Sequence, residues 1–261
     1  MIGVCCALAA CTSAGPAELE PWQDLGGSAW TVGEADASER WPAEVPGTIH
    51  TDLMQAGVIP DPYFGTDQDS VQWVGERNWT YERRFDASPE LLEQPEVELV
   101  FDGLDTFAEV WLNGQRLGTA DNMFRSWVFP VKELLRPADN HLVVRFTSAL
   151  QRGRELLAQY GRTLPADNDV GPDKVSPFVR KAGIHFGWDF APRLVTCGIW
   201  KQVGLRGSSG ARIQSVRVFQ TAKAGTREVT VAIDLRTQEV TGGKATVRLN
   251  GRTLAEAPIE D

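Results

Sequence analysis

Apolar and polar residues alternate along much of the chain, with a period of two that is typical of β-strands with one buried face. Every second residue is apolar from Val97 to Phe101 and from Leu142 to Phe146, and Trp79, Tyr81 and Phe85 suggest another strand. Phe107–Leu112 is followed by Asn113-Gly114, a pair that favours a two-residue hairpin because both residues tolerate positive φ. A sandwich or jelly roll is predicted from about Trp22 onward.

Two segments have helical spacing instead. Ile49, Leu53 and Met54 share one helical face, with Gly57 as a C-terminal cap. Leu150, Leu157 and Tyr160 do the same in a segment that ends at Gly161. A loop containing proline and aspartate then runs over residues 163–177, and loops of this length in a compact domain are usually functional or mobile.

The last part of the chain again predicts strands. Residues 198–206 are expected to close the sandwich, and Gly207-Ser208-Ser209-Gly210 is the best candidate for a linker. Alternating segments follow at 213–219, 229–235 and 245–249, and Asn250-Gly251 predicts another hairpin turn. Three strands do not complete an immunoglobulin-like fold, which needs about seven, so this domain is expected to be truncated.

Charge and composition narrow the class of partner. The net charge of −9 and the pI near 5.0 exclude the basic footprint of a nucleic-acid-binding protein. Nine tryptophans are many for 261 residues, and tryptophan serves both in cores and as a wall for sugar rings. The three histidines and four cysteines have no metal-ligand spacing, so neither a metal nor another cofactor is expected.

The first residues resemble an export signal. A short apolar run over residues 2–10 ends in Leu8-Ala9-Ala10-Cys11, which is similar to the bacterial lipoprotein cleavage box, in which the cysteine is lipidated. A chance apolar tail is the alternative, because no Lys or Arg precedes the run. The expected location is the periplasm or a lipid-anchored envelope position. Cys197, outside this region, is expected to be a buried, inert thiol.

Several strings, in order along the chain, resemble the β-mannosidase branch of glycoside hydrolase family 2. They cover about Trp22 to Arg206. The strings are Val45-Pro46-Gly47-Thr48-Ile49-His50-Thr51-Asp52-Leu53, Gly57-Val58-Ile59-Pro60-Asp61-Pro62-Tyr63, Trp73-Val74, Asn78-Trp79-Thr80-Tyr81, Phe101-Asp102-Gly103-Leu104-Asp105-Thr106, Asp121-Asn122-Met123-Phe124, Phe178-Val179-Arg180-Lys181, Phe186-Gly187-Trp188-Asp189 and Gly198-Ile199-Trp200-Lys201.

The resemblance implies an all-β fold and a modular enzyme. Residues 1–20 would be signal and linker, 21–207 a jelly-roll sugar-binding domain, and 208–261 an incomplete immunoglobulin-like β-sandwich. It further implies a retaining exo-hydrolase of terminal β-linked mannose whose two catalytic glutamates lie on a barrel of about 250 residues. Such a barrel is expected to lie outside this chain, so no catalytic residue is assigned and the chain alone is expected to be inactive.

The resemblance also implies a sugar contact. In the family, the Trp-Asp pair of a Trp-Asp-Trp-Gly-Pro string reaches the active site. Here that string reads Trp188-Asp189-Phe190-Ala191-Pro192. A carboxylate accepts hydroxyl hydrogen bonds and an indole covers the C–H face of a pyranose. The alternative is that Trp188 belongs to the core and Asp189 caps a turn. Ala191, where the family has glycine, raises the question of a changed backbone path.

Arg180 and Lys181 are supporting candidates, and two other functions remain open. The two cations either position Asp189 or a neighbouring carboxylate, or form an exposed basic pair. The chain could instead be a carbohydrate-binding module, or part of a family 2 enzyme for β-galactosides, β-glucuronides or β-glucosaminides. The expected partner is a mannose-containing oligosaccharide or glycoside, with the oligomeric state left open.

Overall fold

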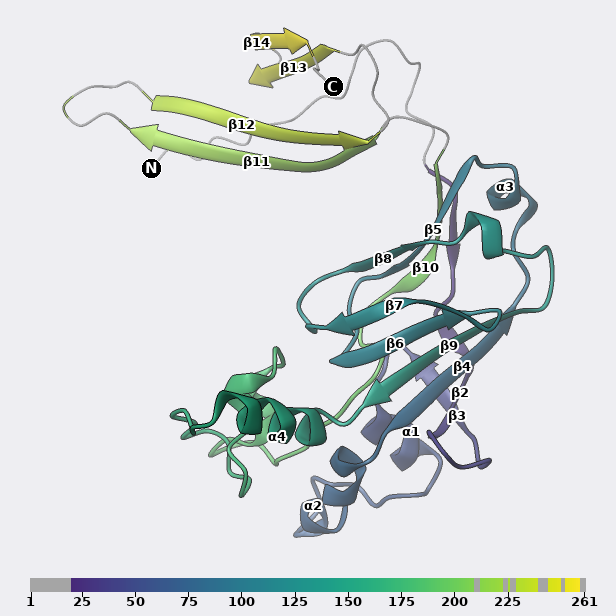
Figure 1. The fold of residues 1–261 in the computed structure, drawn as a ribbon, viewed down its shortest axis with the longest axis vertical. Coiled ribbons are helices and arrows are strands. Elements are labelled where there is room, and N and C mark those ends of the chain that lie inside the picture. The colour runs from purple at the N-terminus through teal and green to yellow at the C-terminus, as the bar shows by residue number, and fades with distance from the viewer. Residues whose placement is uncertain are drawn as a thin grey trace. The chain divides into compact units, whose positions relative to one another are not determined.

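A computed structural model describes residues 20–208, 212–222, 225, 229–238, 244–249 and 252–258. Residues 20–208 form one compact unit, called the sandwich below, and the described residues from Arg212 onward belong to a second. No helix in the described ranges is long and apolar enough to cross a membrane. Figure 1 shows the strands and helices of both units.

The sandwich contains two sheets in which all paired strands are antiparallel. One sheet has six strands in the order β3-β2-β4-β9-β6-β7, and the other has four in the order β1-β10-β5-β8 (Figure 1). The strands are β1 (Trp22–Asp24), β2 (Gly27–Glu34), β3 (Trp41–Val45), β4 (Trp79–Phe85), β5 (Glu96–Phe101), β6 (Phe107–Leu112), β7 (Gln115–Asp121), β8 (Trp127–Pro130), β9 (Asn140–Thr147) and β10 (Val203–Ser208). The predicted all-β sandwich is confirmed.

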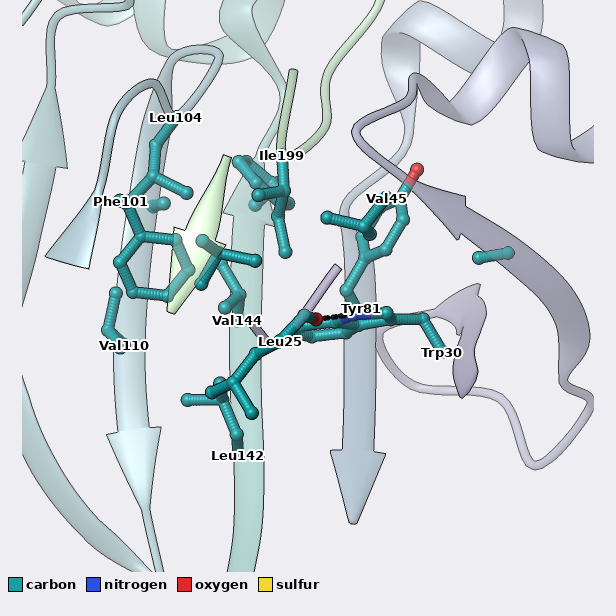
Figure 2. Packing of buried hydrophobic residues seen from close by; sticks show 14 of the residues in the cluster. Leu25, Trp30, Val45, Tyr81, Phe101, Leu104, Val110, Leu142, Val144 and Ile199 are labelled. Carbon is teal, nitrogen blue, oxygen red and sulfur yellow. Dashed lines mark hydrogen bonds between the residues drawn. The ribbon is translucent and has the colours of Figure 1, made fainter. Parts of the chain in front are cut away.

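Both sheets contribute side chains to one core (Figure 2). Phe101 comes from the four-stranded sheet and Tyr81, Val110 and Val144 from the six-stranded sheet, and all four side chains are fully buried. Burying a side chain of this kind contributes about 1.5–3 kcal/mol. Trp30 can lie in this core because its indole N–H donates to the carbonyl of Leu25 at 2.7 Å, so the indole nitrogen keeps a partner (Figure 2).

The predicted hairpin joins β6 to β7. Asn113 and Gly114 have φ values of 52° and 84°, the positive angles that this turn requires. The Asn113 side-chain amide also donates to the carbonyl of Leu134 at 2.7 Å, which ties the turn to the neighbouring loop.

Helices and 3₁₀ turns lie at the margins of the sheets. Both predicted helices are present, α1 followed by Gly57 and α4 ending at Gly161, and both glycines have positive φ. Ser148 caps α4 by accepting from the backbone N–H of Gln151 at 3.2 Å. The elements are α1 (Ile49–Gln55), α2 (Asp67–Ser70), α3 (Pro89–Leu92), α4 (Ala149–Tyr160), η1 (Gln72–Glu76), η2 (Lys132–Leu134), η3 (Ser176–Phe178) and η4 (Gly183–Phe186).

The predicted end of the sandwich needs correction. The closing strand begins at Val203 rather than at residue 198, and Gly207 and Ser208 belong to it instead of to a linker. A Cβ on Gly207 would lie 2.6 Å from Cγ of Gln94, so glycine is present here because neighbouring atoms approach closely. The remaining linker residues, Ser209 and Gly210, lie outside the described ranges.

The second unit contains two antiparallel hairpins in the residues described. Three of its strands match predicted segments and the fourth was not predicted. They are β11 (Arg212–Ala222), β12 (Val229–Gln238), β13 (Lys244–Leu249) and β14 (Arg252–Pro258). The predicted turn residues Asn250 and Gly251 lie outside the described ranges, and the immunoglobulin-like topology stays a prediction.

Candidate functional site

Asp189 lies at the tip of a tight turn. The backbone N–H of Trp188 donates to the carbonyl of Ala191 at 3.2 Å, and the N–H of Ala191 donates back at 3.4 Å, which leaves Asp189 and Phe190 at the tip. Ala191 is not among the residues with positive φ, so the alanine fits this backbone without strain.

The side chains at this tip face solvent. Trp188 is 42% exposed and Phe190 is 76% exposed, and their ring centroids lie 6.5 Å apart. Asp189 is also exposed and has no side-chain hydrogen bond or ion pair with the described residues. The alternative placing of Trp188 in the core is therefore wrong. The tip offers one unpaired carboxylate beside two aromatic faces.

The N-terminal side of the turn is held by close packing. The backbone N–H of Val170 donates to the carbonyl of Phe186 at 3.1 Å, and Phe186 is fully buried. Gly187 has a φ of 104°, and a Cβ on it would lie 2.6 Å from Cγ2 of Val170. Glycine is needed between the buried Phe186 and the exposed Trp188 for both reasons.

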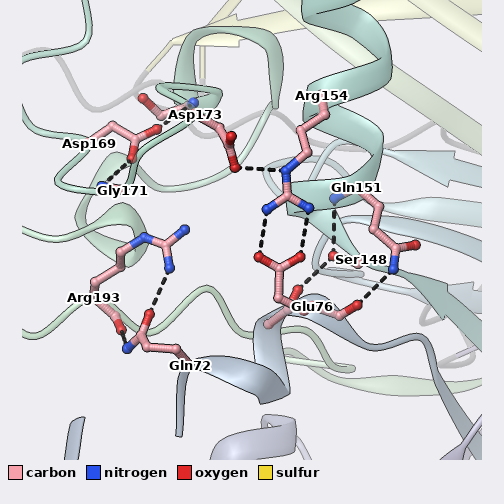
Figure 3. A network of polar contacts seen from close by, with 11 residues as sticks. Gln72, Glu76, Ser148, Gln151, Arg154, Asp169, Gly171, Asp173 and Arg193 are labelled. Atoms are coloured by element: carbon pink, nitrogen blue, oxygen red, sulfur yellow. Dashed lines mark hydrogen bonds and ion pairs between the residues drawn. The ribbon is translucent and has the colours of Figure 1, made fainter. Parts of the chain in front are cut away.

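A polar network holds the C-terminal side (Figure 3). Arg193 donates to the side-chain oxygen of Gln72 at 2.7 Å, and Gln72 donates back to the Arg193 carbonyl at 2.8 Å. Beside it, the Arg154 guanidinium binds both carboxylate oxygens of Glu76 at 2.6 and 2.7 Å and Asp173 at 2.7 Å. These contacts fix the 163–177 loop and the end of the turn segment to α4 and η1.

Lys181 joins both ends of the segment that carries the turn. Its ammonium group donates to the Asp105 carboxylate and, at 2.7 Å, to the carbonyl of Thr196. The backbone of Asp105 in turn exchanges two hydrogen bonds with Gly198, at 3.0 and 3.1 Å. The Lys181 and Asp105 side chains are 0% and 1% exposed. One buried ion pair therefore lies where the segment 181–196 begins and, through the Thr196 carbonyl, where it ends.

Two histidines and a cysteine surround this ion pair. Nδ1 of His185 lies 3.6 Å from the Asp105 carboxylate, which is beyond hydrogen-bonding range. Burial, and then the positive charge of Lys181, lowers the pKa of His50 and of His185 to about 4. Burial likewise lowers the pKa of Lys181, and the Asp105 carboxylate opposes that effect. Cys197 is buried, as expected, and burial raises the pKa of its thiol.

The supporting pair Arg180 and Lys181 separates into two environments. Lys181 is buried and donates to Asp105, so it is not part of an exposed basic pair. Its carboxylate partner is Asp105 and not Asp189. Arg180 is exposed, and its carbonyl accepts from the backbone N–H of Met123 at 3.1 Å. Asp105 was not a candidate site residue in the sequence analysis. It lies in one of the strings that resemble the family, but the sequence did not indicate that its side chain is buried.

Among the described residues, no three His, Cys, Asp or Glu side chains gather as a metal site. The turn instead has the chemistry of a binding surface for a polyhydroxylated ligand. The Asp189 carboxylate can accept hydrogen bonds from hydroxyl groups, and the Trp188 and Phe190 rings can cover apolar C–H faces. Cys11, the proposed lipidation site, lies outside the described residues.

Sandwich and exposed turn together define a galactose-binding-like β-sandwich domain. Residues 30–201 match the model of the glycosyl hydrolase 2 galactose-binding domain-like family, which is more than half of the chain. The chain belongs to glycoside hydrolase family 2.

Relatives and solved structures agree with this assignment. Over 62% of this chain, the sequence is 41% identical to β-mannosidase B of Thermothelomyces thermophilus. Over 92% of this chain, it is 32% identical to β-mannosidase of Rattus norvegicus. The crystal structure of β-D-mannosidase from Dictyoglomus thermophilum matches 92% of the chain with a TM-score of 0.75 and 33% identity. The chain spans 19%, 28% and 29% of these three proteins, respectively.

Proposed function

We propose that this chain is the N-terminal part of a retaining exo-β-mannosidase that removes terminal non-reducing β-D-mannose residues. In this proposal Asp189 and Trp188 contact the terminal sugar, and the two catalytic carboxylates come from residues outside the chain. The observation that carries the proposal is the exposed, unpaired Asp189 at the tip of an anchored turn, in a chain whose relatives at 32–41% identity are named β-mannosidases.

The geometry supports a contact role for Asp189. Contacts at Lys181, Gly187 and Arg193 anchor the segment that carries the turn, while its tip stays in solvent. An anchored tip loses little conformational freedom when a ligand binds, so more of the contact energy appears as affinity. Neighbours that are β-glucuronidases and a β-galacturonidase share 14–18% identity, and that likeness concerns the fold alone.

Two measurements test the proposal. Sequencing the gene beyond codon 261 should reveal an open frame encoding a barrel with two active-site glutamates, and an unrelated continuation would contradict the enzyme assignment. In the complete gene product, Asp189→Ala should lower kcat/KM for an aryl β-mannoside by at least about a hundredfold, because a charge-assisted contact of about 1.5–3 kcal/mol is lost together with positioning of the sugar.

A matched variant separates contact from folding. Asp167→Ala removes a carboxylate from another loop of the sandwich and should leave turnover unchanged. If Asp189→Ala has wild-type kinetics, Asp189 does not contact the reacting sugar, whatever the rest of the gene encodes.

We further propose that the protein is exported and held at the bacterial envelope through a lipid on Cys11. The proposal rests on the apolar run and the Leu8-Ala9-Ala10-Cys11 string. Metabolic labelling with palmitate should mark the wild-type protein and not Cys11→Ala, and equal labelling of both would refute the anchor.

A further inference from the structure

A cavity of about 830 Å³ lies at one end of the six-stranded sheet. Strand register brings Phe107 of β6 opposite Asp121 of β7 and Thr147 of β9, and all three line the cavity. The start of β8 and the segment from α4 to Arg180 supply the remaining walls. Neither Trp188 nor Asp189 lines it. Its volume is within the range of small-molecule sites.

The net charge of the residues that line this cavity is positive, whereas that of the whole chain is negative. Three arginines and two carboxylates line it, although the chain carries a net charge of −9. Glu109 is paired with Arg116 at 2.6 Å, and Arg152 with Glu155 at 2.5 Å, so these charges are largely compensated.

Two guanidinium groups remain without an anionic partner. Arg125 and Arg180 have no ion pair with any described residue, and neither does Asp121. The Arg125 guanidinium lies 4.4 Å from the ring centroid of Trp127, and the Trp127 indole N–H donates to the carbonyl of Asn122 at 3.2 Å. Arg125 is therefore held in place by stacking, and its N–H donors stay available at the edge of the group.

The remaining walls suit a sugar. Phe107 and Phe178 give apolar surface, and Thr147 adds a hydroxyl to the lining. Asp121 offers an acceptor for hydroxyl groups, while a guanidinium presents paired donors that match a carboxylate. A ligand with one carboxylate and several hydroxyls would satisfy the two arginines and Asp121 together.

We propose that this cavity binds an acidic saccharide, with the carboxylate of a uronic acid unit bound between Arg125 and Arg180 and its hydroxyls facing Asp121. The site is independent of the sugar contact proposed for Asp189. It would let the protein recognise acidic side groups or chain ends of a glycan.

The test compares two disaccharides that differ by one carboxylate. Calorimetry on the 261-residue chain would measure binding of cellobiouronic acid (glucuronic acid β-1,4-linked to glucose) and of cellobiose. We expect the acid to bind at least about tenfold more tightly, which is the lower end of the effect of a charge-assisted hydrogen bond. Equal affinity for the two sugars, or no binding of either, would overturn the proposal.

Variants with different expected effects sharpen the test. Arg180→Gln and Arg125→Gln should each weaken binding of the acid about tenfold, whereas Asp121→Asn should change it much less, because removal of a like charge offsets the weaker hydroxyl contact. Arg84→Gln is the control, because Arg84 is exposed but does not line the cavity, and it should not change binding. All four residues are exposed, and circular dichroism would verify that each variant is folded.

Two outcomes would contradict the assignment specifically. If Asp121→Asn weakens binding as much as Arg180→Gln, the cavity recognises neutral hydroxyls rather than a carboxylate. If sulfate at equal ionic strength displaces cellobiouronic acid completely at the same concentration, the cavity is a simple anion site and the saccharide part of the proposal is wrong.

Discussion

Replacing Lys181 with methionine would test whether one buried ion pair holds the turn that carries Asp189. Methionine keeps an unbranched apolar chain of similar length, so the change removes the charge with little change in volume. The Lys181 ammonium has two partners, the Asp105 carboxylate and the Thr196 carbonyl, and both lose their donor in the variant.

The expected cost follows from burial. The Lys181 and Asp105 side chains are 0% and 1% exposed, so Asp105 would keep its charge away from water with only the Thr106 hydroxyl as a remaining side-chain donor. Leaving such a charge unpaired costs about 3–5 kcal/mol. A domain has a total stability of about 5–15 kcal/mol, so the variant should fold at room temperature with a much lower denaturation midpoint.

Tryptophan fluorescence during urea unfolding would measure this cost for the sandwich alone. All nine tryptophans lie between Trp22 and Trp200, within the first compact unit. The exposed neighbour Arg180→Met is the control and should change the free energy of unfolding by less than about 0.5 kcal/mol. Hydrogen exchange should also quicken in residues 182–195, since both ends of that segment lose their common attachment.

A double variant separates the charge from the loss of packing. In Lys181→Met/Asp105→Leu neither member of the buried ion pair remains, so at least half of the lost stability should return. The reasoning would be refuted if Lys181→Met cost less than about 1 kcal/mol, a third of the smallest expected value, or if the double variant were as unstable as the sum of its single variants.

Three further predictions concern the groups around this site. Because the pKa of His50 and of His185 is lowered from 6.5 to about 4, the unfolded chain takes up protons first, so stability should fall as the pH drops from 6.5 to 4, by up to about 1.4 kcal/mol per pH unit for each histidine. His50→Gln should flatten that slope in urea titrations at several pH values, and an unchanged slope would show that burial of His50 is not its cause. Ser148→Ala should cost about 1–2 kcal/mol in urea unfolding, since Ser148 caps α4 and donates to the Gly75 carbonyl at 2.6 Å, whereas Ser148→Thr should restore most of it. Gly103→Ala should lower the thermal unfolding midpoint, because its Cβ would overlap Nε1 of Trp200, and a midpoint equal to that of the wild type would show that Trp200 moves aside freely.

The most predictable strands were those in which buried and more exposed residues alternate. In β9, and in β5 as far as Leu99, the alternation in the sequence matches the alternation in burial. Asn113-Gly114 likewise has the backbone angles that its residue types favour. The linker prediction was wrong at Gly207. Glycine is required there for close packing against Gln94, and the sequence alone does not distinguish such a glycine from one in a flexible linker. Local pattern gives no information on which atoms approach a residue from elsewhere.

The candidate site was predictable only in part. The resemblance pointed to Trp188 and Asp189, and the structure places both at an exposed tip, but nothing in the local sequence indicates that Lys181 reaches Asp105, which lies 76 residues earlier. His50 and His185 likewise come near Lys181 only through the fold of the whole sandwich.

The two adjacent cations show how the fold assigns separate tasks to residues of similar chemistry. The backbone carbonyl of Arg180 binds Met123, and the next residue turns its side chain to the interior, so Arg180 lines an open cavity while Lys181 lies in the core. A compact ammonium suits the interior because its donors meet Asp105 and the Thr196 carbonyl, whereas a planar guanidinium suits an open site that receives a carboxylate. Exchanging the two residues should therefore impair both sites, because Lys181→Arg would bury a larger group and Arg180→Lys would offer a point charge in place of paired donors.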